Sequence, residues 1–104
     1  MDNYDIIISD LAKRDIRSIS SYIKYDLHEP AIAKTLIDTI IDGIFSLSDM
    51  PSRINLVNDE HLAEKQIRGL QIKNYTVFFR INKYDKIIEI IRVLYSRRDW
   101  QSLL

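Results

Sequence analysis

The fold of this chain is decided by residues 68–95, RGLQIKNYTVFFRINKYDKIIEIIRVLY. Apolar side chains recur in three runs in and just before this stretch, at 66–72, 75–81 and 87–94. In the second run every other residue from Tyr75 to Ile81 is apolar, which is typical of a strand that buries one face. The connections between the runs are short, so consecutive strands pair as antiparallel neighbours. The stretch therefore predicts three antiparallel strands.

The residues before this stretch predict a strand followed by two helices. Residues 3–9 (NYDIIIS) alternate like a strand, and Ser9 or Asp10 is a favourable residue to begin a helix. Apolar residues then recur at helical spacing, which predicts a first helix from Leu11 to about His28. They are Ala12, Ile16, Ile19, Ile23 and Leu27.

A second apolar stripe begins after Pro30, a residue that suits the first turn of a helix, and it ends at Met50-Pro51. Its members are Ala33, Leu36, Ile37, Ile40, Ile41, Ile44 and Leu47. Two helices of about 18–20 residues joined by a short connection form an antiparallel hairpin. The polar residues 52–65 predict a loop with one helical turn near Glu60–Glu64.

This order of elements predicts an α+β fold. We expect an N-terminal strand and an antiparallel helical hairpin that packs on one face of a small, mainly antiparallel sheet. The other face of the sheet is then expected to carry Arg68, Arg80 and Arg92. With 104 residues, the chain has room for one domain, spanning residues 1–104.

Composition excludes several classes of protein. The chain has no cysteine, so a disulfide scaffold, a cysteine-based zinc site and thiol catalysis are excluded. No apolar run approaches the ~18 residues that span a bilayer, and the acidic N-terminus does not resemble a secretory signal. We therefore expect a cytoplasmic protein without a membrane partner.

Cofactor and metal motifs are also lacking. The two histidines, His28 and His61, have no metal-binding spacing, and Gly43 and Gly69 are too few for a phosphate-binding loop. We expect neither a cofactor nor a metal.

Charge is distributed unevenly along the chain, although the formal net charge is zero. Residues 1–52 hold five basic and nine acidic residues, whereas residues 53–104 hold ten basic and six acidic ones. Residues 65–98 include nine basic residues and only two acidic ones, Asp85 and Glu89. This asymmetry indicates a surface for a polyanion or an acidic partner.

The basic half interleaves cations with aromatic residues, and this pattern has three interpretations. Guanidinium groups and aromatic rings can hold RNA, and they can also stabilise a strained phosphodiester while a tyrosine or a cation transfers a proton. In the third interpretation Arg68, Arg80 and Arg92 only form ion pairs with Glu89 and the acidic helices. Spacing alone does not choose between them.

Over nearly its whole length the sequence resembles the RelE/ParE toxins of bacterial type II toxin–antitoxin systems. The resemblance begins with an N-terminal strand and continues through residues 10–16 (DLAKRDI), Tyr22-Ile23 and the second helical stripe. Its most specific parts are residues 68–81 (RGLQIKNYTVFFRI) and 88–95 (IEIIRVLY). The family fold, a helical hairpin on a small antiparallel sheet, agrees with the pattern above.

The resemblance implies a growth-inhibiting toxin, associated with plasmid stabilisation, that a cognate antitoxin neutralises in a hetero-oligomer. RelE-like members are ribosome-dependent mRNA endoribonucleases, whereas ParE-like members inhibit DNA gyrase by binding. RelE-like nucleases usually carry arginine where this chain has Thr76, and many have histidine where it has Tyr95. The lysine pair of some nucleases is not evident at Ile67 and Gly69. These departures favour a ParE-like toxin.

The alternative is a metal-independent endoribonuclease that acts on the ribosome and its mRNA, so whether the chain is an enzyme stays open. In that case the catalytic residues implied are Arg68, Tyr95, Arg97 and Arg98. In either case a second set of residues is expected to bind the partner. They are Lys73, Tyr75, Arg80, Arg92 and Trp100.

Overall fold

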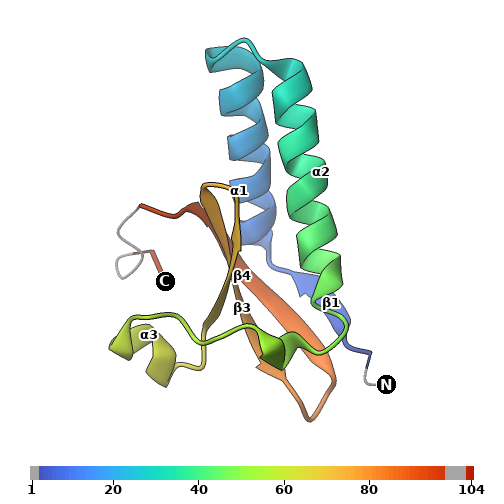
Figure 1. The fold of residues 1–104 in the computed structure, drawn as a ribbon, viewed down its shortest axis with the longest axis vertical. Helices are drawn as coiled ribbons and strands as arrows, with labels where there is room; N and C mark the ends of the chain where they lie inside the picture. Colours follow the sequence, from blue (N-terminus) through green and yellow to red (C-terminus); the bar gives the residue numbers. More distant parts are fainter. Residues whose placement is uncertain (1–2, 98–102) are drawn as a thin grey trace.

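The computed structural model describes residues 3–97 and 103–104 of the chain (Figure 1). The elements follow the order strand, helical hairpin, short helices and three strands. They are β1 (Asp5–Ile8), α1 (Asp10–Ser21), the π-helical turn η1 (Tyr22–Asp26), α2 (Pro30–Ser46), the 3₁₀ turn η2 (Pro51–Arg53), α3 (Glu60–Glu64), β2 (Arg68–Ile72), β3 (Tyr75–Asn82) and β4 (Ile87–Tyr95). The expected α+β architecture is confirmed.

The sheet has the strand order β1-β4-β3-β2. β2 and β4 both pair antiparallel with β3, as the pattern of residues 68–95 predicts. β1 is the exception to the antiparallel arrangement, because it runs parallel to β4 from Asp5 opposite Ile87 to Ile8 opposite Ile90. Residues 91–95 of β4 thus extend beyond the paired part of β1, and α1 packs against β4.

The two helices differ from the prediction at their C-terminal ends. Ser9 begins α1 as expected, and its Oγ accepts a hydrogen bond from the Ala12 amide at 3.0 Å. The predicted first helix ends in the wider π-helical turn η1. α2 ends at Ser46 because the following residues pair with the N-terminus: the Tyr4 amide donates to the Ser48 carbonyl at 2.8 Å. Within the described part of the chain, no helix has the length and apolar character needed to cross a membrane.

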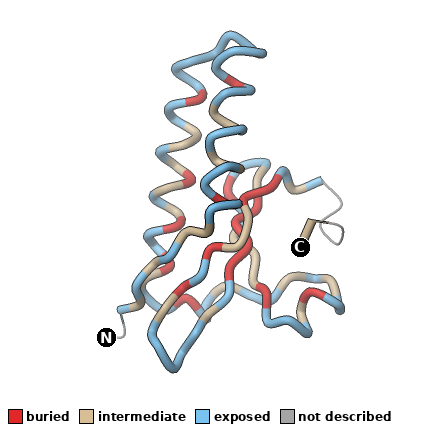
Figure 2. The backbone as a smooth tube through the Cα atoms, turned by 180° about the vertical axis from the view of Figure 1, so that it is seen from behind, coloured by how far each residue is buried: buried red, intermediate tan, exposed pale blue. Residues whose placement is uncertain are grey.

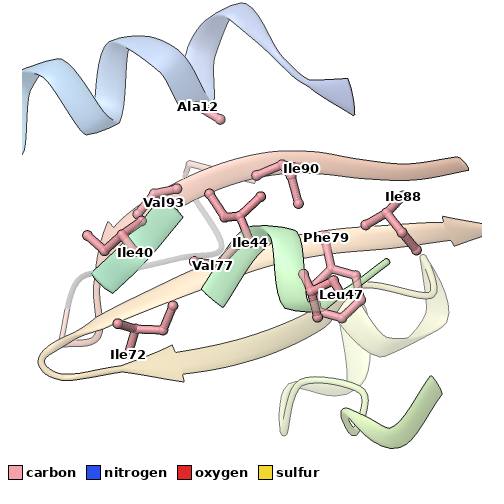
Figure 3. Packing of buried hydrophobic residues seen from close by; sticks show 10 residues of the cluster. All are labelled: Ala12, Ile40, Ile44, Leu47, Ile72, Val77, Phe79, Ile88, Ile90 and Val93. Carbon is pink, nitrogen blue, oxygen red and sulfur yellow. The ribbon is translucent and has the colours of Figure 1, made fainter. Parts of the chain in front are cut away.

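A main core fills the space between the hairpin and one face of the sheet (Figures 2 and 3). α2 contributes fully buried Ile40 and Ile44, which pack with Val77 and Phe79 of β3. The remaining fully or nearly buried members are Ala12, Leu47, Ile72, Ile88, Ile90 and Val93. Apolar burial of this kind contributes roughly 25 cal/mol per Å² and fixes the hairpin on the sheet.

A second, smaller core lies on the opposite side of β3. Phe78 and Leu94 are buried there with Leu62 of α3 and with Ile67. The C-terminal residues Leu103 and Leu104 are half-buried against the same cluster. The sequence predicts arginines on this face, and the structure adds an apolar cluster that packs with α3 and with Leu103 and Leu104.

The register of the strands corrects the predicted position of Arg68. Arg68 lies opposite Phe79, whose side chain is in the main core, so Arg68 belongs to the same face as the hairpin. The physical reason is strand parity: Leu70 and Ile72, two and four residues later, both pack on that core. Arg92 lies opposite Phe78 and therefore belongs to the other face, as expected.

Candidate functional site

Arg92 forms a largely buried ion pair that joins β4 to α1. Its Nε and Nη2 donate to the two carboxylate oxygens of Asp15 at 2.7 and 2.8 Å, and its Nη1 donates to the Leu103 carbonyl at 3.2 Å. The Asp15 carboxylate also accepts from the Val93 amide at 3.0 Å. The hydrogen bonds that Arg92 donates to Asp15 raise the pKa of Arg92, while burial acts in the opposite direction. The guanidinium group of Arg92 thus forms its hydrogen bonds within the chain.

Arg68 is also tethered within the chain. Its Nη1 donates a 2.6 Å hydrogen bond to the Ile54 carbonyl, in the segment that follows η2. Its strand partner Phe79 lies four residues along β3 from Tyr75, the partner of Tyr95. At ~3.3 Å per residue, about 13 Å of strand separates Arg68 from Tyr95. The backbones of the two residues are therefore well separated along the sheet.

The other predicted cations lie at separate positions on the surface. Arg80 forms a long 3.8 Å ion pair with Glu89, and both side chains are about half exposed. Lys73 is exposed in the turn between β2 and β3, where its φ of 54° is left-handed, and Arg97 is exposed after β4. Arg98 and Trp100 lie outside the described residues. Arg80 and Arg92 thus form ion pairs with acidic residues of the same chain, as one of the three interpretations of the basic half predicts.

Two of the predicted aromatic residues do come together. The rings of Tyr75 and Tyr95 make an edge-to-face contact with centroids 5.7 Å apart and an interplanar angle of 65°. Burial raises the pKa of Tyr75 above its usual value of 10.0, and the neighbouring Tyr95 and Tyr22 raise it further. Tyr75 is therefore a neutral phenol at physiological pH and a poor general base.

The position next to Tyr75 holds a network of neutral polar groups. Thr76 is only 4% exposed, and its Oγ1 lies 3.2 Å from the Gln71 Oε1 and 2.9 Å from the Ser96 Oγ. Gln71 in turn donates to the Ser96 Oγ at 2.9 Å. In a nuclease, the resemblance implies an arginine at the position of Thr76. In this chain the Thr76 hydroxyl is already hydrogen-bonded to neighbouring side chains.

An apolar groove lies between the outer half of the hairpin and the β2–β3 turn. It has a volume of about 520 Å³ and is lined by side chains that include Tyr22, Leu27, Ile32, Lys73 and Tyr75. Leu27, predicted for the core stripe, is 49% exposed, because the hairpin projects past the end of the sheet (Figure 1). Element length gives no sequence signal for this groove, because the 17 residues of α2 extend about 26 Å and the eight residues of β3 extend about as far.

Comparison with known proteins assigns the family. A family model described as the ParE toxin of the type II toxin–antitoxin system parDE matches residues 6–100. The chain belongs to the ParE toxin family. This assignment favours the ParE-like interpretation of the sequence over the RelE-like one. No curated protein sequence matches this ParE-family toxin significantly.

Solved structures agree with the fold of this toxin. A chain of the chromosomal ParDE system from P. aeruginosa is 18% identical, with a TM-score of 0.74 over 91% of this chain and 98% of that one. A chain of the toxin–antitoxin complex RelBE2 from Mycobacterium tuberculosis is 19% identical, with a TM-score of 0.64 over 89% and 98% of the two chains. A mutant of the E. coli toxin RelE in the free state is 11% identical, with a TM-score of 0.68 over 97% and 92%.

Chemically, the described residues form binding surfaces more readily than a reaction centre. No group of three or more His, Asp or Glu side chains in residues 3–97 and 103–104 is arranged to hold a metal ion. The arginines are divided between the two faces and the two ends of the sheet, and two of them are hydrogen-bonded within the chain. The groove offers apolar contact area, and the exposed Lys73 in its lining offers a positive charge.

Proposed function

We propose that this ParE-family toxin stops growth by binding DNA gyrase and that it breaks no bond in the process. A cognate antitoxin, present in the same cytoplasm, neutralises it in a hetero-oligomeric complex. The observation that carries the proposal is the dispersal of the cations. An endoribonuclease needs several groups within reach of one phosphate, whereas Arg68, one of the predicted nuclease residues, starts about 13 Å of strand away from Tyr95, another of them.

Three contacts support this conclusion. Arg68 is tethered to the Ile54 carbonyl about 13 Å of strand away from Tyr95. Arg92 already uses its fork on Asp15. Thr76 supplies a buried, satisfied hydroxyl where a nuclease has an arginine. The absence of one such transition-state donor costs about 10²–10³ in rate, so this sheet is a poor nuclease scaffold.

The surface supports a role in protein binding. The groove combines exposed Tyr22 and Ile32 with Lys73 at its rim, and exposed apolar surface of this kind marks a protein interface. The chain is basic in its second half, which favours an acidic partner. An antitoxin with both acidic and apolar residues fits this surface, and two of the similar solved structures come from toxin–antitoxin systems.

Gyrase supercoiling with purified components tests the proposal. We expect the toxin to inhibit the reaction in a dose-dependent way, and an excess of antitoxin to restore it. A Thr76→Val variant should inhibit equally, because the hydroxyl has no chemical role in binding. A toxin that leaves gyrase active but cleaves mRNA on purified ribosomes would establish the nuclease function instead.

A further inference from the structure

A second, smaller pocket lies at the other end of the hairpin-side face, away from the groove. It has a volume of about 310 Å³ and is lined by Gln66, Arg68, Ile81 and Lys83. Arg68 lies opposite Phe79, and Ile81 is the next residue of β3 on that face. β2 is the last strand of the sheet, and residues 54–57 cover its outer edge next to Arg68, where Leu56 bridges to Arg68. Gln66 and Lys83 are exposed, so a partner can reach the pocket from their side.

The two cations of this pocket, Arg68 and Lys83, have no acidic partner among the described residues. Within the described part of the chain, neither Arg68 nor Lys83 forms an ion pair with a carboxylate. The Ile54 carbonyl accepts one hydrogen bond from the Arg68 Nη1 and so fixes the guanidinium, while the Nε and Nη2 donors have no partner within the described chain. An oriented fork beside a second cation and an amide is suited to a carboxylate or phosphate group.

We propose that this pocket binds the carboxylate of an aspartate or glutamate side chain of the antitoxin. The inference rests on the proposed function, because it requires an antitoxin. Ile81 provides an apolar wall for the methylene groups of such a side chain. The basic character of residues 65–98 favours an acidic partner at this site.

The neighbouring charges favour a single carboxylate over a nucleic acid. Asp85 lies in the same turn as Lys83, where it is hydrogen-bonded to Asn82, and Glu64 precedes Gln66 by two residues. An extended polyanion gains affinity from several consecutive cations, and these acids interrupt such a series. A side chain that carries one negative charge fits between them.

The affinity of the toxin for its antitoxin, measured by calorimetry at low and high salt, tests this inference. Lys83→Gln should weaken binding about tenfold at low salt, since hydrogen bonds to charged groups are among the stronger ones. The loss should shrink as salt increases. Lys13→Gln is the matched control: Lys13 is also exposed but lies on α1, which packs along β4, away from β2. This control should change the affinity less than about twofold.

Two further variants identify the ligand group. Lys83→Glu should weaken binding about 100-fold, and a lysine in place of the contacted antitoxin acid should restore affinity for this variant alone. Arg68→Lys keeps the charge but loses the fork. It should abolish the saturable shift of the Gln66 side-chain resonances that sodium acetate, but not sodium chloride, produces in the wild-type toxin.

The outcomes separate this inference from the proposed function. If the antitoxin binds and growth stops, but Lys83→Gln and Lys13→Gln are indistinguishable, the pocket assignment is wrong and the toxin function stands. If Lys83→Gln weakens only the binding of a single-stranded oligonucleotide, the pocket is a nucleic-acid contact. If the wild-type toxin binds no antitoxin at all, both the assignment and the proposed function are overturned.

Discussion

Replacing Asp15 by alanine tests whether one ion pair holds the hairpin on the edge of the sheet. The Asp15 carboxylate accepts three hydrogen bonds of 2.7–3.0 Å, two from Arg92 and one from the Val93 amide. The side chains are only 12% and 15% exposed. Asp15→Ala leaves a largely buried cation and an unpaired amide, so we expect a loss of about 3–5 kcal/mol in unfolding free energy.

Urea denaturation followed by circular dichroism measures this loss. Glu89→Ala is the matched control, because it breaks the exposed 3.8 Å pair with Arg80 and should cost less than about 1 kcal/mol. The double variant Asp15→Leu/Arg92→Met removes both charges together and should lose less stability than Asp15→Ala alone. If Asp15→Ala costs no more than Glu89→Ala, the ion pair does not anchor the hairpin and the reasoning is refuted.

Three further substitutions test local parts of the structure. Ser9→Ala removes the α1 cap and the 2.8 Å bond to the Ile91 carbonyl, and should cost about 1–2 kcal/mol in urea denaturation. Thr76→Val should cost about 1–2 kcal/mol in the same assay and leave growth inhibition on induction intact. Tyr75 has a folded-state pKa above the unfolded value, so its contribution to stability is present below pH 10 and is lost as the pH rises through the raised pKa. Tyr75→Phe should therefore lose less stability above that pH than the wild type, as measured by denaturation across pH.

Local patterns in the sequence predict much of this fold. The alternation from Tyr75 to Ile81 and the apolar run from Ile87 to Leu94 correspond to β3 and β4 almost residue for residue. The helical turn expected near Glu60–Glu64 is α3, and Ser9 begins α1 as predicted. These features depend on residues close together in the chain, for which periodicity and capping are sufficient signals.

Features that depend on distant residues were not predictable in the same way. The parallel pairing of β1 with β4 joins Asp5 to Ile87, and the Asp15–Arg92 ion pair spans 77 positions. Sequence spacing allowed Arg92 to bind a ligand or an internal acid, and only the packing of α1 on β4 selects the acid. The prediction that Arg68 lies on the face away from the hairpin is wrong, although the parity of Arg68 with Leu70 and Ile72 is visible in the sequence.

The candidate site illustrates the same limit. Lys73, Tyr75 and Tyr95 were singled out from the sequence, and the structure places them at one end of the sheet. The groove beside them was not foreseen, because the stripe that contains Leu27 resembles a core face. Whether such a residue is covered depends on how far the hairpin extends past the strands, which is a property of the assembled fold.

Pulse labelling of DNA and protein synthesis within minutes of tightly controlled induction tests the central claim most directly. A toxin that binds gyrase should stop DNA synthesis first while translation continues. Wild type and Thr76→Val should behave alike. An early stop in protein synthesis while DNA synthesis continues would contradict this account and would place Arg68, Tyr95 and Arg97 in a ribosome-dependent active site.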